Sequence, residues 1–128
     1  MDAERLPNTD PVIRTIAMPA DTNPAGDIFG GWLMAQMDLA AGNVAARIAR
    51  GRCATIAVDQ MTFLSPVLVG DEVSFYGTVV KRGRTSIRIR IEAWRRKRDE
   101  DEMRRVTEAT FTFVAIDENR KPRPLPAD

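Results

Sequence analysis

Residues 31–50 read GWLMAQMDLAAGNVAARIAR and form the one long stretch of helical periodicity in the chain. Apolar residues recur along it at steps of three and four, which is the spacing of one helical face. No proline interrupts the run, and Gly51 follows it as a C-terminal stop signal. The segment therefore predicts a single long amphipathic helix with one apolar stripe, made of Leu33, Met37, Ala40, Ala41, Val44 and Ile48.

On both sides of this helix the sequence predicts strands and loops. After Gly51 the apolar period changes to two, which indicates strands over residues 54–64, 73–81, 85–94 and 105–116. Before the helix, residues 12–18 predict a short strand. Residues 19–31 are dense in Pro, Gly, Asp and Asn and predict a loop, in which Asp27 caps the helix or braces the loop.

This order of elements predicts an α+β fold. Consecutive strands joined by short turns form an antiparallel meander. The helix must bury its apolar stripe, and the sheet is the partner available to it. We therefore expect a curved antiparallel sheet wrapped around one long central helix. Residues 1–128 should form a single domain, with residues 1–11 as a peripheral leader and residues 118–128 as a peripheral Pro-rich tail.

Composition narrows the range of partners. The chain has 128 residues, of which 44% are hydrophobic and 29% charged, and its formal charge is +1. A charge near zero gives no general attraction to nucleic acid or to a membrane surface. No apolar run approaches the roughly 18 residues that span a bilayer. The first residues, MDAERLPNTDP, do not resemble a secretory signal. We therefore expect a cytoplasmic protein with no nucleic-acid partner and no membrane insertion.

The absence of histidine restricts the chemistry. There is no His and only one Cys in the sequence. Ser-His-Asp and Cys-His catalysis, His-containing zinc sites and intrachain disulfides are therefore excluded within the chain. Any reaction must use carboxylates, amides, hydroxyls, Lys, Arg or backbone dipoles. With a single Cys, a Cys-rich metal site is excluded as well.

Two features of the helix are candidates for a site. Asp38 lies on one helical line with the small residues Gly31, Ala35 and Gly42, which leave room beside its carboxylate. The alternative is an ordinary exposed helical Asp. Gly30 and Gly31 lie where the helix begins, and the first N–H groups of a helix have no partners inside it. The glycine pair is equally compatible with an oxyanion hole and with a simple Gly-rich helix entry.

A longer segment carries a family resemblance. Residues 18–38 read MPADTNPAGDIFGGWLMAQMD, and shorter matches are MTFLSP at 61–66, VGD at 69–71, GRTS at 83–86, TEA at 107–109 and KPRPLP at 121–126. Together these resemble the hotdog-fold acyl-CoA thioester hydrolases of the YciA type, from about residue 12 to the end. The resemblance implies a homodimer, commonly assembled further as a trimer of dimers. It also implies fatty acyl-CoA substrates and no metal or organic cofactor.

The resemblance also implies roles for particular residues. Asp38 would be the general base or the nucleophile. Asn23, which precedes it by 15 residues, would face the Asp38 carboxylate of the partner subunit. The N–H of Gly31, beside Gly30, would stabilise the oxyanion. On the strand after the helix, Thr55 and Asp59 could line the same cleft, although a structural role is the simpler interpretation.

The remaining candidates are cationic or nucleophilic. Lys81, Arg82 and Arg84 surround Gly83, and Ser86 follows. In the light of the resemblance, binding of the CoA phosphates is an alternative to a solvated turn. The cations of residues 95–98 suit a solvated, charged turn. Cys53 follows Arg52, which could lower its pKa, but a small buried residue is the favoured interpretation.

Two other functions compete with thioester hydrolysis. Hotdog dehydratases and hydratases resemble this fold but use a catalytic His, which this chain does not contain. A non-catalytic acyl-CoA-binding hotdog protein is the alternative that remains. Thiol release from acyl-CoA, measured together with CoA binding, separates the two.

Overall fold

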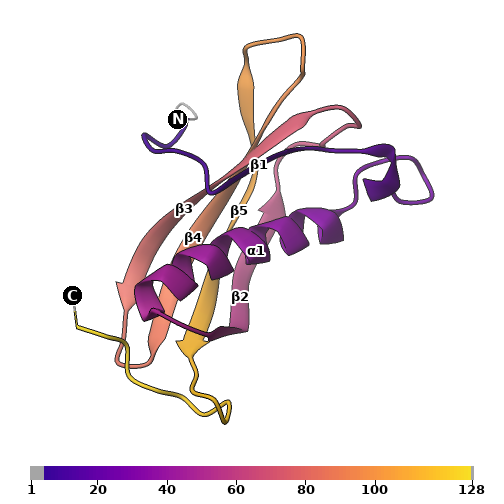
Figure 1. The fold of residues 1–128 in the computed structure, drawn as a ribbon. Helices are drawn as coiled ribbons and strands as arrows, with labels where there is room; N and C mark the ends of the chain where they lie inside the picture. The colour runs from indigo at the N-terminus through magenta and orange to yellow at the C-terminus, as the bar shows by residue number, and fades with distance from the viewer. Residues whose placement is uncertain (1–4, 128) are drawn as a thin grey trace.

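The computed structural model describes residues 5–127 as one helix packed against one five-stranded antiparallel sheet (Figure 1). Residues 1–4 of the expected leader, and residue 128 of the tail, lie outside the described part. The elements in chain order are β1 (Ile13–Ile16), a 3-10 turn (Pro19–Asp21), α1 (Gly30–Ala49), β2 (Cys53–Phe63), β3 (Glu72–Arg82), β4 (Ser86–Arg96) and β5 (Met103–Ala115).

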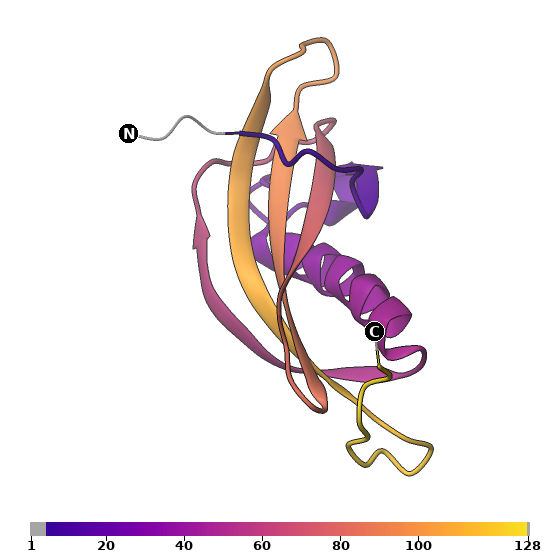
Figure 2. The same cartoon turned by 90° about the vertical axis from the view of Figure 1, so that its left-hand side faces the viewer.

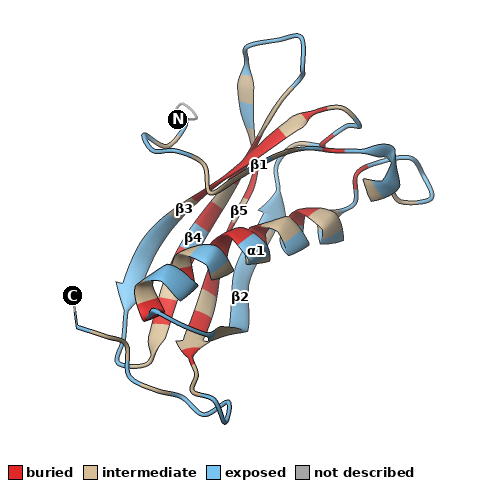
Figure 3. Cartoon of the chain, in the orientation of Figure 1, coloured by how far each residue is buried: buried red, intermediate tan, exposed pale blue. Residues whose placement is uncertain are grey.

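The helix lies across the concave face of the sheet, and the strands bend around it (Figure 2). Its stripe meets the alternate residues of β4 and β5 that the periodicity assigned to the core, including Ile87, Ile89, Phe111 and Phe113. Figure 3 shows this buried stripe on α1 facing the sheet. The predicted curved sheet around one long helix is therefore confirmed.

The order of the strands differs from a simple meander. It runs β1-β3-β4-β5-β2, so only β3, β4 and β5 follow one another as hairpins. Strand β2 pairs with β5 instead of β3. The connection from β2 to β3, residues 64–71, is longer than the two to five residues typical of a hairpin loop. It crosses from one side of the sheet to the other. As a result, β2 is an edge strand.

Both ends of the helix differ from the expected caps. The N-cap is Phe29, which makes no side-chain capping bond, so Asp27 is not the cap. At the other end Arg50, not Gly51, takes the left-handed conformation, with φ 56°. The amide of Gly51 then donates to the carbonyl of Ala46 at 3.2 Å. The helix ends close to the predicted position, but Arg50 rather than Gly51 adopts the conformation that ends it.

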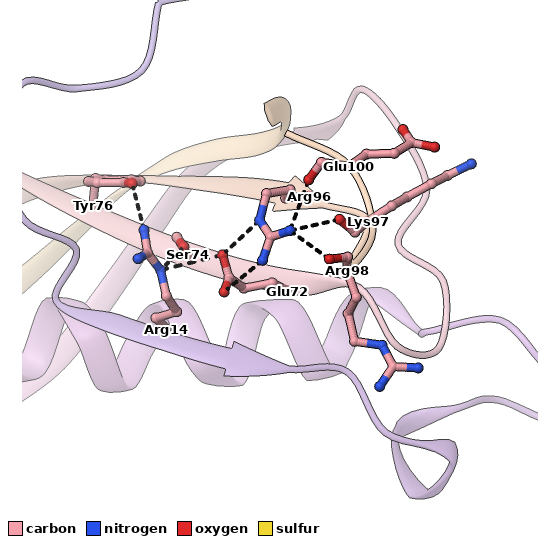
Figure 4. A network of polar contacts seen from close by, with 8 residues as sticks. All are labelled: Arg14, Glu72, Ser74, Tyr76, Arg96, Lys97, Arg98 and Glu100. Atoms are coloured by element: carbon pink, nitrogen blue, oxygen red, sulfur yellow. Dashed lines mark hydrogen bonds and ion pairs between the residues drawn. The ribbon is translucent and has the colours of Figure 1, made fainter. Parts of the chain in front are cut away.

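A polar network fastens one end of the sheet (Figure 4). The Arg96 guanidinium forms an ion pair with Glu72 at 3.2 Å, and Arg14 donates to Ser74 at 2.8 Å and to Tyr76 at 3.4 Å. Arg96 also donates to carbonyl oxygens of the following turn at 3.0, 3.0 and 2.9 Å, those of Lys97, Arg98 and Glu100. The charged turn predicted near residues 95–102 is thus tied to the sheet through its backbone.

The tail runs along the opposite end of the sheet. The amide of Leu125 donates to the carbonyl of Arg84 at 2.8 Å, and Arg82 Nη2 donates to the carbonyl of Pro126 at 2.6 Å. The tail therefore lies against the turn between β3 and β4.

Candidate active site

The Asp38 carboxylate is fixed by a hydroxyl from the sheet. Asp38 lies eight residues after the start of α1, half-buried, on the side of the helix that faces β2. The hydroxyl of Thr55 donates to Asp38 Oδ1 at 2.7 Å. One carboxylate oxygen is thereby anchored, while Oδ2 has no partner recorded among residues 5–127. A carboxylate held in this way can accept a proton from water or attack a carbonyl.

The pairing of β2 with β5 directs the Thr55 side chain towards the helix. In β2, Thr55 pairs with Phe113 and Ala57 pairs with Thr112, so the register shifts between Thr55 and Ala57. Phe113 belongs to the core beneath the helix, and its strand partner Thr55 faces the same side. This is why Thr55 reaches Asp38. The sequence pointed to Thr55 but favoured a structural role, because the pairing of β2 with β5 leaves no local pattern in the sequence.

The small residues beside Asp38 do leave space. A Cβ added to Gly42 would lie 3.7 Å from the ring of Phe113, which is an ordinary contact. Gly31 and Ala35 are exposed along the same helical line. The predicted open side of the helix is therefore present in the folded chain.

Two aromatic rings flank the start of the helix. A Cβ on Gly30 would lie 2.8 Å from the Phe63 ring, and a Cβ on Gly31 would lie 2.9 Å from the Phe29 ring. The amide of Trp32 already donates to the carbonyl of Phe29, so the amides of Gly30 and Gly31 are the donors open to a ligand. Phe29 and Phe63 are each nearly half exposed, so the rings border these donors and leave them accessible to a ligand. The sequence analysis missed both rings, although the order Phe29-Gly30-Gly31 could have signalled one of them.

The Asn23 side chain is oriented by its own loop. Asn23 Oδ1 accepts hydrogen bonds from the amides of Ala25 at 3.0 Å and Asp27 at 3.1 Å. The amide of Asn23 donates to the carbonyl of Asp27 at 2.7 Å. Because two N–H groups occupy the side-chain oxygen, the side-chain NH₂ is the end that can serve a ligand. Of the two roles expected for Asp27, capping the helix or bracing the loop, its backbone contacts with Asn23 match the second.

The structure describes no contact between Asn23 and Asp38 within residues 5–127. The loop that carries Asn23 extends beyond the start of α1, away from the middle of the helix (Figure 1). Asp38 is about 12 Å further along the helix axis than Gly30. A single subunit therefore does not bring the predicted pair together.

Asp59 lies on the other face of the sheet from Asp38. Its Oδ2 accepts from Arg88 Nη2 at 2.7 Å. Arg88 stands between Ile87 and Ile89, which are buried under the helix, so Arg88 and Asp59 face away from it. Asp59 and Thr55 do not line one cleft.

Cys53 is half-buried at the start of β2. Burial raises the pKa of the Cys53 thiol, and the nearby Arg123 guanidinium opposes this with a smaller lowering effect. The expected influence of Arg52 is replaced by that of Arg123, and the thiol is not activated. The sequence predicted a small buried residue at this position, and the structure leaves Cys53 partly exposed.

The proposed CoA-binding residues lie at the turn between β3 and β4. Lys81, Arg82 and Arg84 are exposed there. Ser86 begins β4, and the alternation with buried Ile87 turns its side chain away from the helix. Arg82 donates to the carbonyl of Pro126, which gives it a structural contact with the tail. The turn is at the end of the sheet where α1 finishes, far from the start of the helix (Figure 1).

Neither a metal cluster nor a membrane-spanning helix is found in the described part of the chain. Residues 5–127 contain no group of three or more His, Cys, Asp or Glu side chains placed to hold a metal ion. The helix of this part is not apolar enough over its length to cross a membrane.

Known proteins with similar sequences and structures are thioesterases. Residues 25–102 match the model of the thioesterase superfamily. The acyl-CoA thioester hydrolase YciA of Salmonella typhimurium is 52% identical, over 96% of this chain and 95% of its own. The hexameric thioesterase y2039 of Yersinia pestis is 54% identical with a TM-score of 0.90, over 96% of this chain and 100% of that one.

A third relative is a thioesterase whose fold is known. Cj0915 of Campylobacter jejuni, a hexameric hotdog fold thioesterase, is 38% identical with a TM-score of 0.87, over 92% of this chain and 91% of its own. The curved five-stranded sheet around α1 is the same architecture. The chain therefore has the hotdog fold and belongs to the thioesterase superfamily, with the YciA-type acyl-CoA thioester hydrolases among its relatives.

Proposed function

We propose that the protein hydrolyses fatty acyl-CoA thioesters to the free acid and CoA. The observation that carries this proposal is the Asp38 carboxylate, anchored by Thr55 at 2.7 Å on the open side of the helix. Its relative from Salmonella typhimurium is an acyl-CoA thioester hydrolase. A non-catalytic acyl-CoA-binding protein would not require an oriented carboxylate at this place.

The residues account for each step of the reaction. As general base, Asp38 takes a proton from water, and the resulting hydroxide adds to the thioester carbonyl. The oxyanion is held by the amide of Gly31, with that of Gly30 beside it. When the C–S bond breaks, the CoA thiolate takes the proton back from Asp38. Asp38, the backbone amides and water supply every group that these steps use, so the proposal includes no metal and no organic cofactor.

In the alternative route Asp38 attacks the thioester carbonyl itself, and the C–S bond breaks to release the CoA thiolate and leave an anhydride. Water then opens the anhydride to the free acid and the Asp38 carboxylate, and the proton released goes to the thiolate. Single-turnover hydrolysis in ¹⁸O-labelled water separates the two routes. Only the anhydride route can place the label in the Asp38 carboxylate.

We propose that two copies of the chain share each site. Strand β2 is an edge strand, and its exposed side chains include Ile56 and Val58, with Leu39 exposed on the helix. A long edge strand with apolar side chains is normally covered. A two-fold partner pairing along β2 would place its helix antiparallel to α1. Asn23, Gly30 and Gly31 of one copy would then approach Asp38 of the other.

The relatives support an assembly of several copies. Both y2039 and Cj0915 are hexameric. We propose a trimer of such dimers for this chain, with β2 at the interface within each dimer.

Replacing Asp38 tests the proposed function. Asp38→Asn keeps the size of the side chain and its acceptor for Thr55, but it removes the base and the nucleophile. We expect kcat for the best acyl-CoA to fall by at least about a hundredfold, which is the low end for the loss of a general base. Thiol release gives kcat, and circular dichroism checks the fold.

Glu118→Gln serves as a matched control, because Glu118 is exposed after β5 and outside the proposed site. It should hydrolyse acyl-CoA at the wild-type rate. A folded Asp38→Asn protein with near-normal turnover would refute the assignment. Wild-type protein that binds CoA but releases no thiol from any acyl-CoA would identify a binding protein instead.

A further inference from the structure

An apolar cavity of about 410 Å³ opens beside the start of α1. Its inner wall is formed by side chains that are almost fully buried, those of Ile28, Leu33 and Val67. Its rim is formed by Phe63 and Leu64, which are about half exposed. A buried apolar wall behind an open apolar rim is the form of a ligand site rather than of a packing defect.

The cavity offers no charge to a ligand. None of its lining residues is charged, and the one hydroxyl, that of Ser65, already donates to the carbonyl of Arg105 at 3.1 Å. Three other surface cavities are each bordered by at least four charged side chains. The phosphates and the adenine of CoA therefore have no partner in this cavity. A hydrocarbon chain is the part of an acyl-CoA that it can accept.

The cavity is continuous with the proposed oxyanion site. Gly30 lines it, and the Phe63 ring lies against the same glycine, 2.8 Å from where a Cβ would stand. A thioester whose carbonyl oxygen reached the amides of Gly30 and Gly31 would have its first methylenes at the mouth of the cavity.

We infer that this cavity, between α1 and residues 63–67, is the subsite for the acyl chain, with Leu64 and Phe63 determining how much of the chain is buried. The inference rests on the proposed function, because the occupant is the acyl group of that substrate. It assigns the chain to the subunit that provides the oxyanion donors.

If the inference holds, the affinity for an acyl-CoA analogue depends on the length of its alkyl chain, and Leu64 controls this dependence. Each methylene buried in an apolar site should tighten binding by about fourfold. S-alkyl-CoA thioethers, from S-butyl to S-decyl, cannot be hydrolysed and report binding without turnover. Their Kd values, measured by calorimetry, give the slope per methylene. We expect a slope near fourfold for the wild-type protein over the lengths that fit.

Leu64→Trp fills the mouth of the cavity and should flatten this slope to below about twofold per methylene. The matched control is Leu68→Trp, which lies in the same connection with a similar exposure, 47% against 53%, but borders a charged cavity. It should keep the wild-type slope. Phe63→Leu should act in the opposite direction and extend the chain length at which Kd stops improving.

Each outcome decides the inference. An unchanged slope in Leu64→Trp, or equal flattening in Leu68→Trp, would place the acyl chain elsewhere. If Leu64→Trp does not fold, Phe63→Leu decides, because an unchanged limiting chain length in that variant contradicts the subsite. The proposed function is tested separately by thiol release. Steep thioether binding without any turnover would refute hydrolysis and leave the subsite standing.

Discussion

A hydroxyl that donates to one oxygen of a carboxylate fixes the direction of the other. The Thr55–Asp38 bond of 2.7 Å does this across the gap between β2 and α1. A hydrogen bond to a charged group contributes about 1.5–3 kcal/mol. In the proposed reaction Thr55 touches no reacting atom, so it is a positioning residue for Asp38.

Replacing the Thr55 hydroxyl tests this role. Thr55→Val keeps the branched shape and removes the donor, so we expect kcat to fall about tenfold with little change in KM. Thr55→Ser keeps the donor and should restore most of the rate. Steady-state kinetics on one acyl-CoA measures both values. A Val variant as fast as the Ser variant would show that the bond serves only the fold.

The hydrogen bonds of Asn23 indicate which substitution removes its donor groups without disturbing the loop. Because Oδ1 accepts from the amides of Ala25 and Asp27, truncation to Ala would also loosen the loop. Asn23→Asp retains an acceptor oxygen for both amides and removes only the NH₂ donors. It therefore separates the amide donors that a substrate would use from the acceptor that holds the loop.

The relative positions of single residues were predictable where all of them lie on one helix. Asp38, Gly30 and Gly31 lie on α1 or at its start, and the helical period alone relates them. The Thr55 contact and the Phe63 ring come from β2, which is brought to the helix by the tertiary fold. No local pattern in the sequence encodes such contacts. The roles assigned to Asp38, Gly30 and Gly31, to Asn23 and to the CoA-binding residues remain predictions.

At the scale of elements, periodicity placed the helix and strands β2 to β5 to within about two residues of their observed bounds. It did so because these elements each bury one face, and burial imposes the period. Strand order is different, because the pairing of β2 with β5 depends on contacts between distant residues. The bulge near Gln60, with φ 38°, is also set by that pairing. These features could not be predicted from the sequence alone.

The turn between β3 and β4 is held by the C-terminal tail. The carbonyl of Arg84 accepts from the amide of Leu125, and Arg82 donates to the carbonyl of Pro126. Since Arg82 already has this structural contact, Lys81 and Arg84 are the cleaner tests of CoA binding. Both are exposed at the end of the sheet where α1 finishes. In an antiparallel two-fold pair, that end lies toward the partner's helix start.

Removing these cations should weaken binding of the nucleotide. For Lys81→Ala and Arg84→Ala we expect KM for acyl-CoA to rise about three- to tenfold, because each loses one charge-assisted contact with phosphate. An acyl-pantetheine thioester, which has no nucleotide, should be affected much less. Lys97→Ala, at the opposite end of the sheet, is the control and should leave both KM values unchanged. Equal effects on the two substrates would show that the turn serves only the structure.

The dimensions of the whole molecule support the proposal that two copies share each site. The helix of 20 residues is about 30 Å long, with Gly30 at one end and the β3–β4 turn near the other. Within one chain, Asn23 and the oxyanion donors are separated from Asp38 along this axis. An antiparallel partner helix brings the start of one helix beside the middle of the other. The exposed edge of β2 is the surface along which such a pair can form.

A mixed dimer tests the shared site directly. Asn23→Asp and Asp38→Asn proteins, each inactive, are mixed, unfolded and reassembled. With random pairing half of the dimers are mixed, and each mixed dimer has one site with both lesions and one intact site. About a quarter of the wild-type activity should therefore return, given a two-fold arrangement. Differently tagged subunits, purified in two steps, verify that mixed dimers form. If each site instead used Asn23 and Asp38 of the same chain, every site of a mixed dimer would carry one lesion, and no activity would return.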